Sequence, residues 1–189
     1  EHEMRKTLFV AIVLLAAVFA VCAQAVDENP AAVSTHIVTD HAGYEVEVPN
    51  EIERVAVYGI YPMPSVISVF FNSADKIVAI PKPAYSPAKS GLLGKLYPEI
   101  LDVDTECMSG DAINIEALMA LDPQVVFISD TDAKSREILE TAGIPAIGIS
   151  VDDWDYNCLE TLDHWIELLS EIFEPDSDKI QKVHDYSNK

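Results

Sequence analysis

The sequence predicts an α/β fold in which helices sandwich a mostly parallel sheet and a β-hairpin precedes it. Apolar runs rich in β-branched residues alternate with segments of helical periodicity, which is typical of a parallel sheet covered on both faces. The clearest unit spans 114–129, where a short amphipathic helix precedes Asp122-Pro123 and a continuous apolar run from Val125 to Ile128. Such a run predicts a strand buried on both faces.

Each element follows from local signals in chain order. Residues 37–48 alternate in two halves around Ala42-Gly43, which predicts the hairpin. Asn114 is a good N-cap for the helix that follows, and Pro123 ends that helix because it has no N–H to donate. The predicted strands cover 55–58, 76–80, 124–129 and 145–150, the predicted helices cover 64–71, 92–97, 114–121, 133–142 and 156–173, and a loop is predicted over 81–91.

Residues 1–25 have the pattern of a secretory signal peptide. Arg5 and Lys6 precede an apolar run from Leu8 to Cys22, and Ala23-Gln24-Ala25 offers small residues for cleavage. The run is shorter than the roughly 20 residues that a membrane-spanning helix needs. We therefore expect an exported protein, periplasmic or on the cell surface, that begins at residue 26. An uncleaved anchor and a lipid-modified Cys22 remain alternatives.

Composition and motifs exclude several functions. The net charge of −20 would repel nucleic acid phosphates. The sequence has no Gly-x-Gly-x-x-Gly, no Walker A lysine motif and no Gly-x-Ser-x-Gly elbow, so we expect neither an enzyme nor a cofactor. His36 and His41 are interpreted as surface residues of the hairpin rather than as metal ligands. Asp152-Asp153 is interpreted as a polar loop, with acid/base work as the alternative.

Two cysteines, Cys107 and Cys158, follow the predicted signal. Export would permit a disulfide between them, but spacing in the sequence does not give the distance between their Cα atoms. Two buried free thiols are the alternative.

Two motifs carry a resemblance to a known family. The first is the phrase Asn114-Ile115-Glu116 with its helix, Asp-Pro and strand, and the second is the hairpin 38–49 followed by the strand from Arg54 to Tyr58. In this order they resemble the iron-complex and cobalamin substrate-binding proteins of ABC importers, which have a helical backbone between two lobes. The resemblance covers about residues 35–189.

The resemblance implies a domain organisation. Residues 26–175 would form the N-terminal, Rossmann-like substrate-binding lobe, and 176–189 would begin the helix that links it to a second lobe. That second lobe is absent from the sequence, so we expect either a fragment or the product of a truncated gene.

Because parallel strands end at the same edge of a sheet, loops 59–63, 81–87, 109–113 and 129–132 should converge there, flanked by 151–154. Their aromatic and polar side chains suit a large, partly apolar ligand, although ordinary packing is the alternative for each aromatic residue. The resemblance implies that the ligand is a ferric siderophore, haem or a corrinoid. The candidate ligand-binding residues are Tyr61, Met63, Lys82, Tyr85, Ser109, Gly110, Ser129, Asp130, Thr131 and Trp154.

Glu116 has a separate interpretation. The resemblance implies that it docks on the permease through arginines, whereas an exposed glutamate in a first helical turn also simply favours the helix dipole. The predicted function is capture of an iron chelate or corrinoid outside the cytoplasm and delivery to an ABC permease and its ATPase. Contact with the membrane would come through the permease or through a lipid or helix anchor. The alternative is a membrane-anchored extracellular sensor or adhesion module that uses the same lobe.

Overall fold

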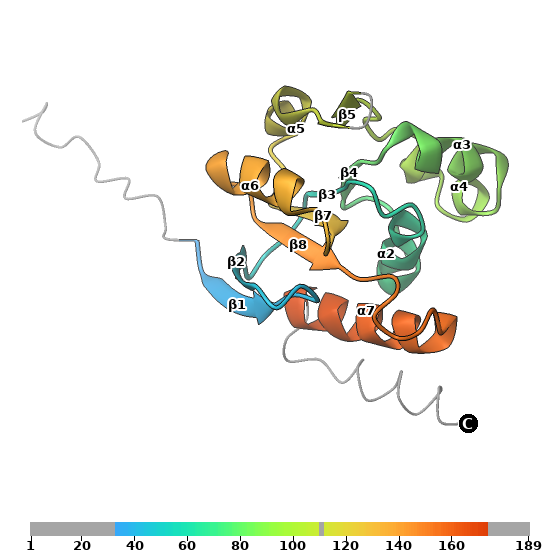
Figure 1. The fold of residues 1–189 in the computed structure, drawn as a ribbon. Helices are drawn as coiled ribbons and strands as arrows, with labels where there is room; N and C mark the ends of the chain where they lie inside the picture. Colours follow the sequence, from blue (N-terminus) through green and yellow to red (C-terminus); the bar gives the residue numbers. More distant parts are fainter. Residues whose placement is uncertain (1–32, 110–111, 174–189) are drawn as a thin grey trace, which may run out of the picture. The chain divides into compact units, whose positions relative to one another are not determined.

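Four parallel strands form the central sheet of the computed structural model, which describes residues 33–109 and 112–173. The strands are β3 (Val55–Val57), β4 (Ile77–Ala79), β7 (Val125–Ser129) and β8 (Ala146–Ile149), in the order β4-β3-β7-β8. All three pairings are parallel, and Figure 1 shows the strands between flanking helices. The predicted α/β class with a mostly parallel sheet is therefore confirmed.

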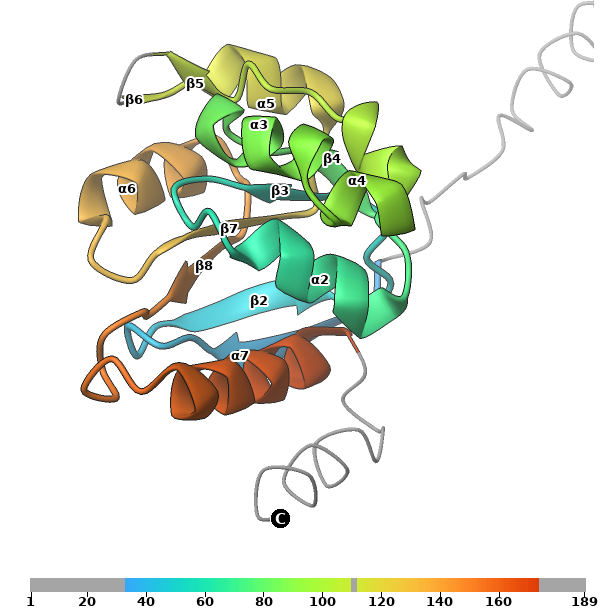
Figure 2. The ribbon, with the colours of Figure 1, turned by 90° about the vertical axis from the view of Figure 1, so that its right-hand side faces the viewer.

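Each face of the sheet has its own hydrophobic core, because successive residues of a strand point to opposite faces. Val57 and Phe127 belong to the first core, whereas Ala56 and Val126 belong to the second. Figure 2 shows α2 and α7 side by side on the first face. The first core receives side chains from α2 (Met63–Phe71), α3 (Lys82–Ser90) and α7 (Cys158–Phe173), and the second from α5 (Ile115–Leu121) and α6 (Ala133–Thr141).

The predicted hairpin is confirmed as β1 (Thr35–Thr39) paired antiparallel with β2 (Glu45–Pro49). Gly43 lies in its turn with a φ of 80°, a left-handed conformation that glycine adopts without steric cost. The carboxylate of Asp40 accepts a hydrogen bond from the Tyr44 N–H at 2.9 Å, which closes the turn.

The hairpin turn lies against β8, the strand at one edge of the sheet. Asp40 Oδ2 accepts a hydrogen bond from the Gly148 N–H at 2.8 Å and forms a salt bridge with Arg136 of α6. Arg136 also donates to the Ala146 carbonyl at 2.9 Å, and its guanidinium lies 4.2 Å from the centre of the Tyr44 ring. The backbone of this edge strand is therefore paired with the turn and with α6 rather than left open to another strand.

The predicted loop over 81–91 is wrong, because this segment contains the helix α3. Pro83 lies in the first turn, where the missing N–H has no helical partner to lose, although Pro87 lies inside the helix. Ala84 and Ala88, one helical turn apart, are buried in the first core. Packing of this small apolar face therefore outweighs the low helix propensity of the prolines.

Several short elements follow α3. The helix α4 (Leu93–Leu96) agrees with the prediction for 92–97. The sequence did not predict the 3₁₀ helix η1 (Pro98–Leu101) or the two-residue strands β5 (Met108–Ser109) and β6 (Ala112–Ile113). No helix in the described ranges 33–109 and 112–173 is long and apolar enough to cross a membrane. The predicted signal 1–25, Cys22 and the predicted linking helix 176–189 lie outside the described residues.

Candidate ligand-binding edge

The four parallel strands all end at one edge of the sheet. The chain leaves it through 58–62 after β3, 80–82 after β4, 130–132 after β7 and 150–157 after β8. We call the surface made by these four segments the carboxyl edge. Ligands of open α/β sheets bind at this position, because neighbouring connections diverge there and leave a crevice.

β7 ends in Ser129 at this edge, and two more polar residues, Asp130 and Thr131, follow it. The Ser129 hydroxyl lies 3.3 Å from a carboxylate oxygen of Asp130 and 3.0 Å from the hydroxyl of Thr131. Ser129 and Asp130 are half-buried and Thr131 is exposed. Asp132 caps α6 by accepting a hydrogen bond from the Ser135 N–H at 3.0 Å. The edge thus carries a small hydroxyl and carboxylate cluster next to a well-capped helix.

Negative charge gathers at the same place. Carboxylate oxygens of Asp130, Asp152 and Asp153 lie within 4.8 Å of one another. Asp152 and Asp153 are exposed, and the Asp153 N–H donates to the buried Ser150 hydroxyl at 3.2 Å. The interpretation of Asp152-Asp153 as a polar loop agrees with their position between β8 and α7.

Tyr61 lies on the other side of the carboxyl edge. Half of its surface is exposed (50%), and it lines an open groove of about 450 Å³ between α2 and α3. Pro62, which precedes α2, lines the same groove together with Pro83 and Pro87 of α3 and with Leu92. This wall is apolar, whereas the wall formed by Asp130, Asp152 and Asp153 is acidic.

Trp154 lies between two histidines. Its ring stacks on His164 of α7 at 4.2 Å and meets His41 edge-on at 5.1 Å. His41 Nδ1 accepts a hydrogen bond from the Ser150 N–H at 3.1 Å, and burial lowers the pKa of His41 below its ordinary value. His41 is therefore half-buried rather than fully at the surface as predicted, because its ring contacts Trp154 and Ser150 in the loop after β8.

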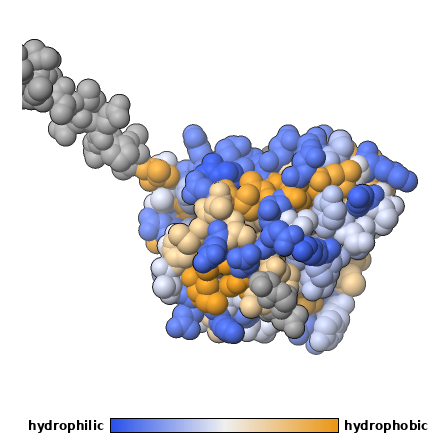
Figure 3. Space-filling view, turned by 90° about the horizontal axis from the view of Figure 1, so that it is seen from above, coloured by the Kyte–Doolittle hydropathy of each residue, from blue (hydrophilic) through white to orange (hydrophobic). Residues whose placement is uncertain are grey.

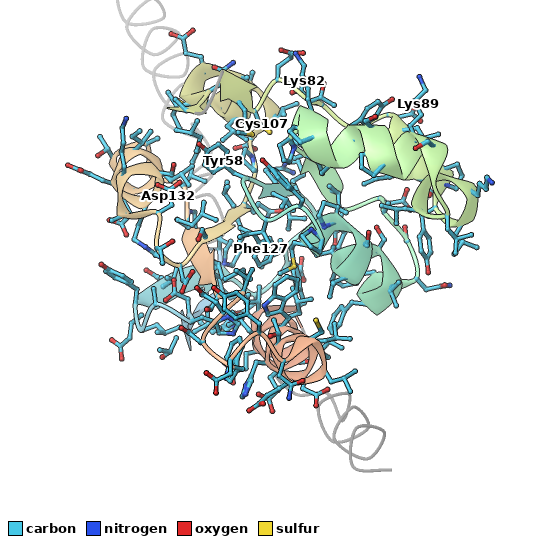
Figure 4. The ribbon with its side chains drawn as sticks, turned by 45° about the vertical axis from the view of Figure 1, so that its right-hand side comes forward. Tyr58, Lys82, Lys89, Cys107, Phe127 and Asp132 are labelled. Atoms are coloured by element: carbon cyan, nitrogen blue, oxygen red, sulfur yellow. The ribbon has the colours of Figure 1, made fainter. Side chains whose placement is uncertain are left out.

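The remaining aromatic and basic candidates are differently placed. Met63 is completely buried in the first core, and Tyr85 packs against that core while its hydroxyl donates to the Leu101 carbonyl at 3.1 Å. Lys82 is exposed and pairs with Glu106 at 2.8 Å. Figure 4 shows Lys82 at the start of α3, with Cys107 and Tyr58 further inside, which agrees with their burial.

The other predicted residues do not belong to the four segments of the carboxyl edge. Ser109 ends β5, and Gly110 lies outside the described residues. Glu116 is exposed in the first turn of α5, and Asn114 caps this helix by accepting a hydrogen bond from the Ala117 N–H at 3.3 Å. Both described cysteines are free thiols, Cys107 buried and Cys158 exposed.

Known proteins share this arrangement of sheet, helices and hairpin, although no protein-family model matches the chain. The periplasmic solute-binding protein of Veillonella parvula superposes with a TM-score of 0.69 at 29% identity, covering 80% of this chain and 44% of that one. The fold is that of one lobe of a periplasmic solute-binding protein. The resemblance predicted from the sequence is thereby confirmed.

Two other binding proteins are also similar to this chain. The molybdate-binding protein MolA of Haemophilus influenzae is 28% identical over 76% of this chain and 44% of its own length. The haem-binding protein HmuT has the same fold, with a TM-score of 0.55 at 18% identity over 78% of this chain and 44% of that one. The chain thus spans less than half the length of the proteins it matches. These proteins are binding proteins rather than enzymes.

Sequence reasoning missed two features of this region. The first is Ser150, whose N–H, hydroxyl and carbonyl contact His41, Asp153 and Trp165 respectively. The second is the salt bridge between Asp40 and Arg136, which lie 96 positions apart. A glycine inside a predicted strand, Gly148, was the available signal, because such a glycine often marks a close approach of another group.

Proposed function

We propose that this chain is the ligand-capturing half of an extracytoplasmic solute-binding protein that delivers a metal chelate to an ABC importer. The observation that carries the proposal is the carboxyl edge of a solute-binding lobe, where Tyr61 and the Ser129-Asp130-Thr131 cluster reach the surface. Residues 26–175 would form this lobe and 176–189 would lead into a second one. The ligand would then be held between the two edges.

A chelate such as a ferric siderophore, haem or a corrinoid suits this edge better than a free oxyanion. Asp130, Asp152 and Asp153 place three carboxylates close together, and like charges brought together cost several kcal/mol at an interface. Lys82, a cation at the same edge, is already paired with Glu106. A large ligand with an apolar surface would also cover the groove beside Tyr61, which a small dianion would leave open.

Delivery requires a surface that the permease recognises. Glu116 is exposed and forms no salt bridge with another residue in the described ranges, so its charge is free to pair with an arginine of a partner. The energy for import would come from the partner ATPase. The lobe itself would carry out no covalent chemistry.

The proposal is tested by titrating the complete protein with haemin, a ferric hydroxamate siderophore, cyanocobalamin and sodium molybdate. Tryptophan fluorescence is a suitable signal, because Trp154 lies in the segment that follows β8 at the carboxyl edge. We expect saturable binding of one chelate and no binding of molybdate. Saturable binding of molybdate alone would refute the chelate assignment, and no binding of any of the four would refute the ligand-capturing role.

Tyr61→Ala should weaken chelate binding by about tenfold, since the loss of a stacked aromatic ring with its buried area reaches about 1.4 kcal/mol. Val69→Ala is the matched control. Val69 is 66% exposed on α2, the helix that follows Tyr61, and lies near the end of that helix, away from the carboxyl edge. Equal effects of the two substitutions would show that the Tyr61 groove is not part of the binding site.

A further inference from the structure

Ser150, the first residue after β8, attaches the loop 151–157 to the rest of the domain through three hydrogen bonds. Its N–H donates to Nδ1 of His41 at 3.1 Å, and its hydroxyl accepts from the Asp153 N–H at 3.2 Å. Its carbonyl accepts from the indole N–H of Trp165 at 2.6 Å. Because Ser150 is completely buried, water does not replace any of these bonds when it breaks.

His41 belongs to the hairpin turn, which is itself held on the edge of the sheet. The preceding residue, Asp40, is buried, accepts a hydrogen bond from the Gly148 N–H and pairs with Arg136. The His41 N–H donates to the Gly148 carbonyl at 3.2 Å. The backbone of His41 is therefore fixed on β8, and its ring supplies the acceptor that the start of the loop requires.

The conformation of the loop 151–157 depends on contacts outside it. Asp155 and Tyr156 are consecutive residues with positive φ angles, 52° and 58°. A bulky side chain adopts this left-handed region only where the surrounding structure imposes it. Six of the seven loop residues are exposed, and the exception is Trp154, whose ring meets that of His41. Contacts with His41 therefore help to hold a strained loop in place.

Charged and titratable groups face the His41 ring from three elements. They are Asp40 in the hairpin turn, Asp153 in the loop after β8, and His164 in α7, which pairs with Glu167 at 3.0 Å. Burial lowers the pKa of His41 below its ordinary value, and a charge on His164 adds to this, whereas the two aspartates and the His164 backbone oppose it. The His41 ring is therefore neutral at neutral pH and takes up a proton only in acid.

Neutral and protonated His41 differ at Nδ1. A neutral imidazole has one nitrogen that accepts a hydrogen bond, whereas both nitrogens of an imidazolium are donors. Protonation would therefore leave the buried N–H of Ser150 facing a donor instead of an acceptor. An unpaired buried N–H costs free energy, so a state in which the loop has left the hairpin becomes more favourable. That released state binds a proton more readily, and a falling pH therefore favours it.

We propose that His41 is a positioning residue for the carboxyl edge, whose neutral ring holds the loop 151–157 with Asp152 and Asp153 in place and whose protonation releases it. The release of the loop stands on the structure of this domain alone. The consequence for binding rests on the proposed capture function: the complete protein holds its chelate at neutral pH and binds it more weakly in acid.

Hydrogen exchange of the full chain, followed by mass spectrometry, measures the release of the loop. Between pH 7.5 and 5.0, protection of the amides of 150–157, corrected for intrinsic exchange rates, should fall about tenfold or more in the unaltered protein. In His41→Asn it should not change, because the asparagine oxygen accepts from the Ser150 N–H and does not titrate. His41→Ala has no acceptor and should lack this protection at both pH values.

Two controls separate the loop from its surroundings. His164→Phe keeps a ring against Trp154 but removes the second titratable histidine, so its loop should lose protection in acid as the unaltered protein does. Figure 3 looks onto the side of the domain that carries α5, which packs on the second core and should keep its protection. Equal losses in His41→Asn and the unaltered protein, or full protection of His41→Ala at pH 7.5, would overturn the inference. A pH dependence that disappears in His164→Phe, or an equal loss in α5, would also overturn it.

Titration of the complete protein with haemin, a ferric hydroxamate siderophore and cyanocobalamin at both pH values connects the loop with capture. The probe that binds at pH 7.5 should bind about tenfold more weakly at pH 5.0 in the unaltered protein and equally well at both in His41→Asn. Equal weakening in the two proteins would refute the positioning role of His41. Binding of none of the three probes at pH 7.5 would instead refute the proposed function, and hydrogen exchange would then decide the role of His41 by itself.

Discussion

Asp40→Asn is expected to destabilise the full chain by about 3–5 kcal/mol, because it leaves the charge of Arg136 buried without a counter-ion. The Arg136 side chain is 4% exposed and that of Asp40 is 0% exposed, so water does not replace the lost interaction. Removing one partner of a buried pair costs more than the pair contributes, since the remaining charge keeps its desolvation penalty.

The hydrogen bonds of Asp40 also predict that Asp40→Asn destabilises the protein. Its two carboxylate oxygens accept from three donors, which are the N–H groups of Tyr44 and Gly148 and the guanidinium of Arg136. An asparagine has one acceptor oxygen and one NH₂ group, so in either orientation its NH₂ faces a donor. A loss of 3–5 kcal/mol is a large part of the total stability of a domain, which is about 5–15 kcal/mol. The melting temperature should therefore fall by about 10 °C or more.

Urea unfolding followed by circular dichroism measures this loss. The control is Asp122→Asn, which alters a second arginine–aspartate pair, between Arg54 and Asp122 at 2.6 Å. These side chains are 41% and 85% exposed, and exposed pairs contribute only about 0–1 kcal/mol. Adding Arg136→Met to Asp40→Asn should restore part of the stability. Equal losses from Asp40→Asn and Asp122→Asn would refute the reasoning.

Two further predictions concern titratable side chains. Burial lowers the pKa of His41, although the charges of Asp40 and Asp153 oppose this. The unfolded chain therefore binds a proton more readily than the folded protein does, so the stability that neutral His41 contributes is present above its ordinary pKa of 6.5 and is lost as the pH falls. Between pH 7.5 and 5.0 the melting temperature should fall more in the unaltered protein than in His41→Asn, and equal falls would contradict this. Burial raises the pKa of Cys107 to about 11, so in a Cys22→Ser chain at pH 8 Ellman's reagent should label the exposed Cys158 and reach Cys107 only on unfolding. Two thiols labelled in the native protein would contradict this second expectation.

The sequence predicted the elements whose signals are local. Asn114 and Pro123 bracket α5, and the run from Val125 to Ile128 has the composition of a buried strand, so propensity and pattern agree with the fold. The helix α3 could not be predicted in this way, because Pro83 and Pro87 oppose a helix locally. Its stability comes from Ala84 and Ala88, which meet the first core only when the chain is folded.

At the carboxyl edge, the sequence predicted which loops converge, but not which of their side chains reach the surface. Parallel strands must end at one edge, so the convergence of 129–132 and 151–154 followed from the prediction of a parallel sheet. Whether Met63 faces the core or the surface depends on how α2 rotates against the sheet. Whether Trp154 is free to meet a ligand depends on His41 and His164, which come from two distant elements.

Aspartates have different surroundings at the hairpin turn and at the carboxyl edge. Asp40 is buried and fully paired, and it holds the hairpin turn on the edge of the sheet. Asp130, Asp152 and Asp153 lie close together at the carboxyl edge and form no salt bridge with another described residue, so their charges are not neutralised within the described part of the chain. The buried aspartate therefore serves the fold, whereas the three at the carboxyl edge have charges that a bound group could meet, as the proposed ligand-binding role of this edge requires.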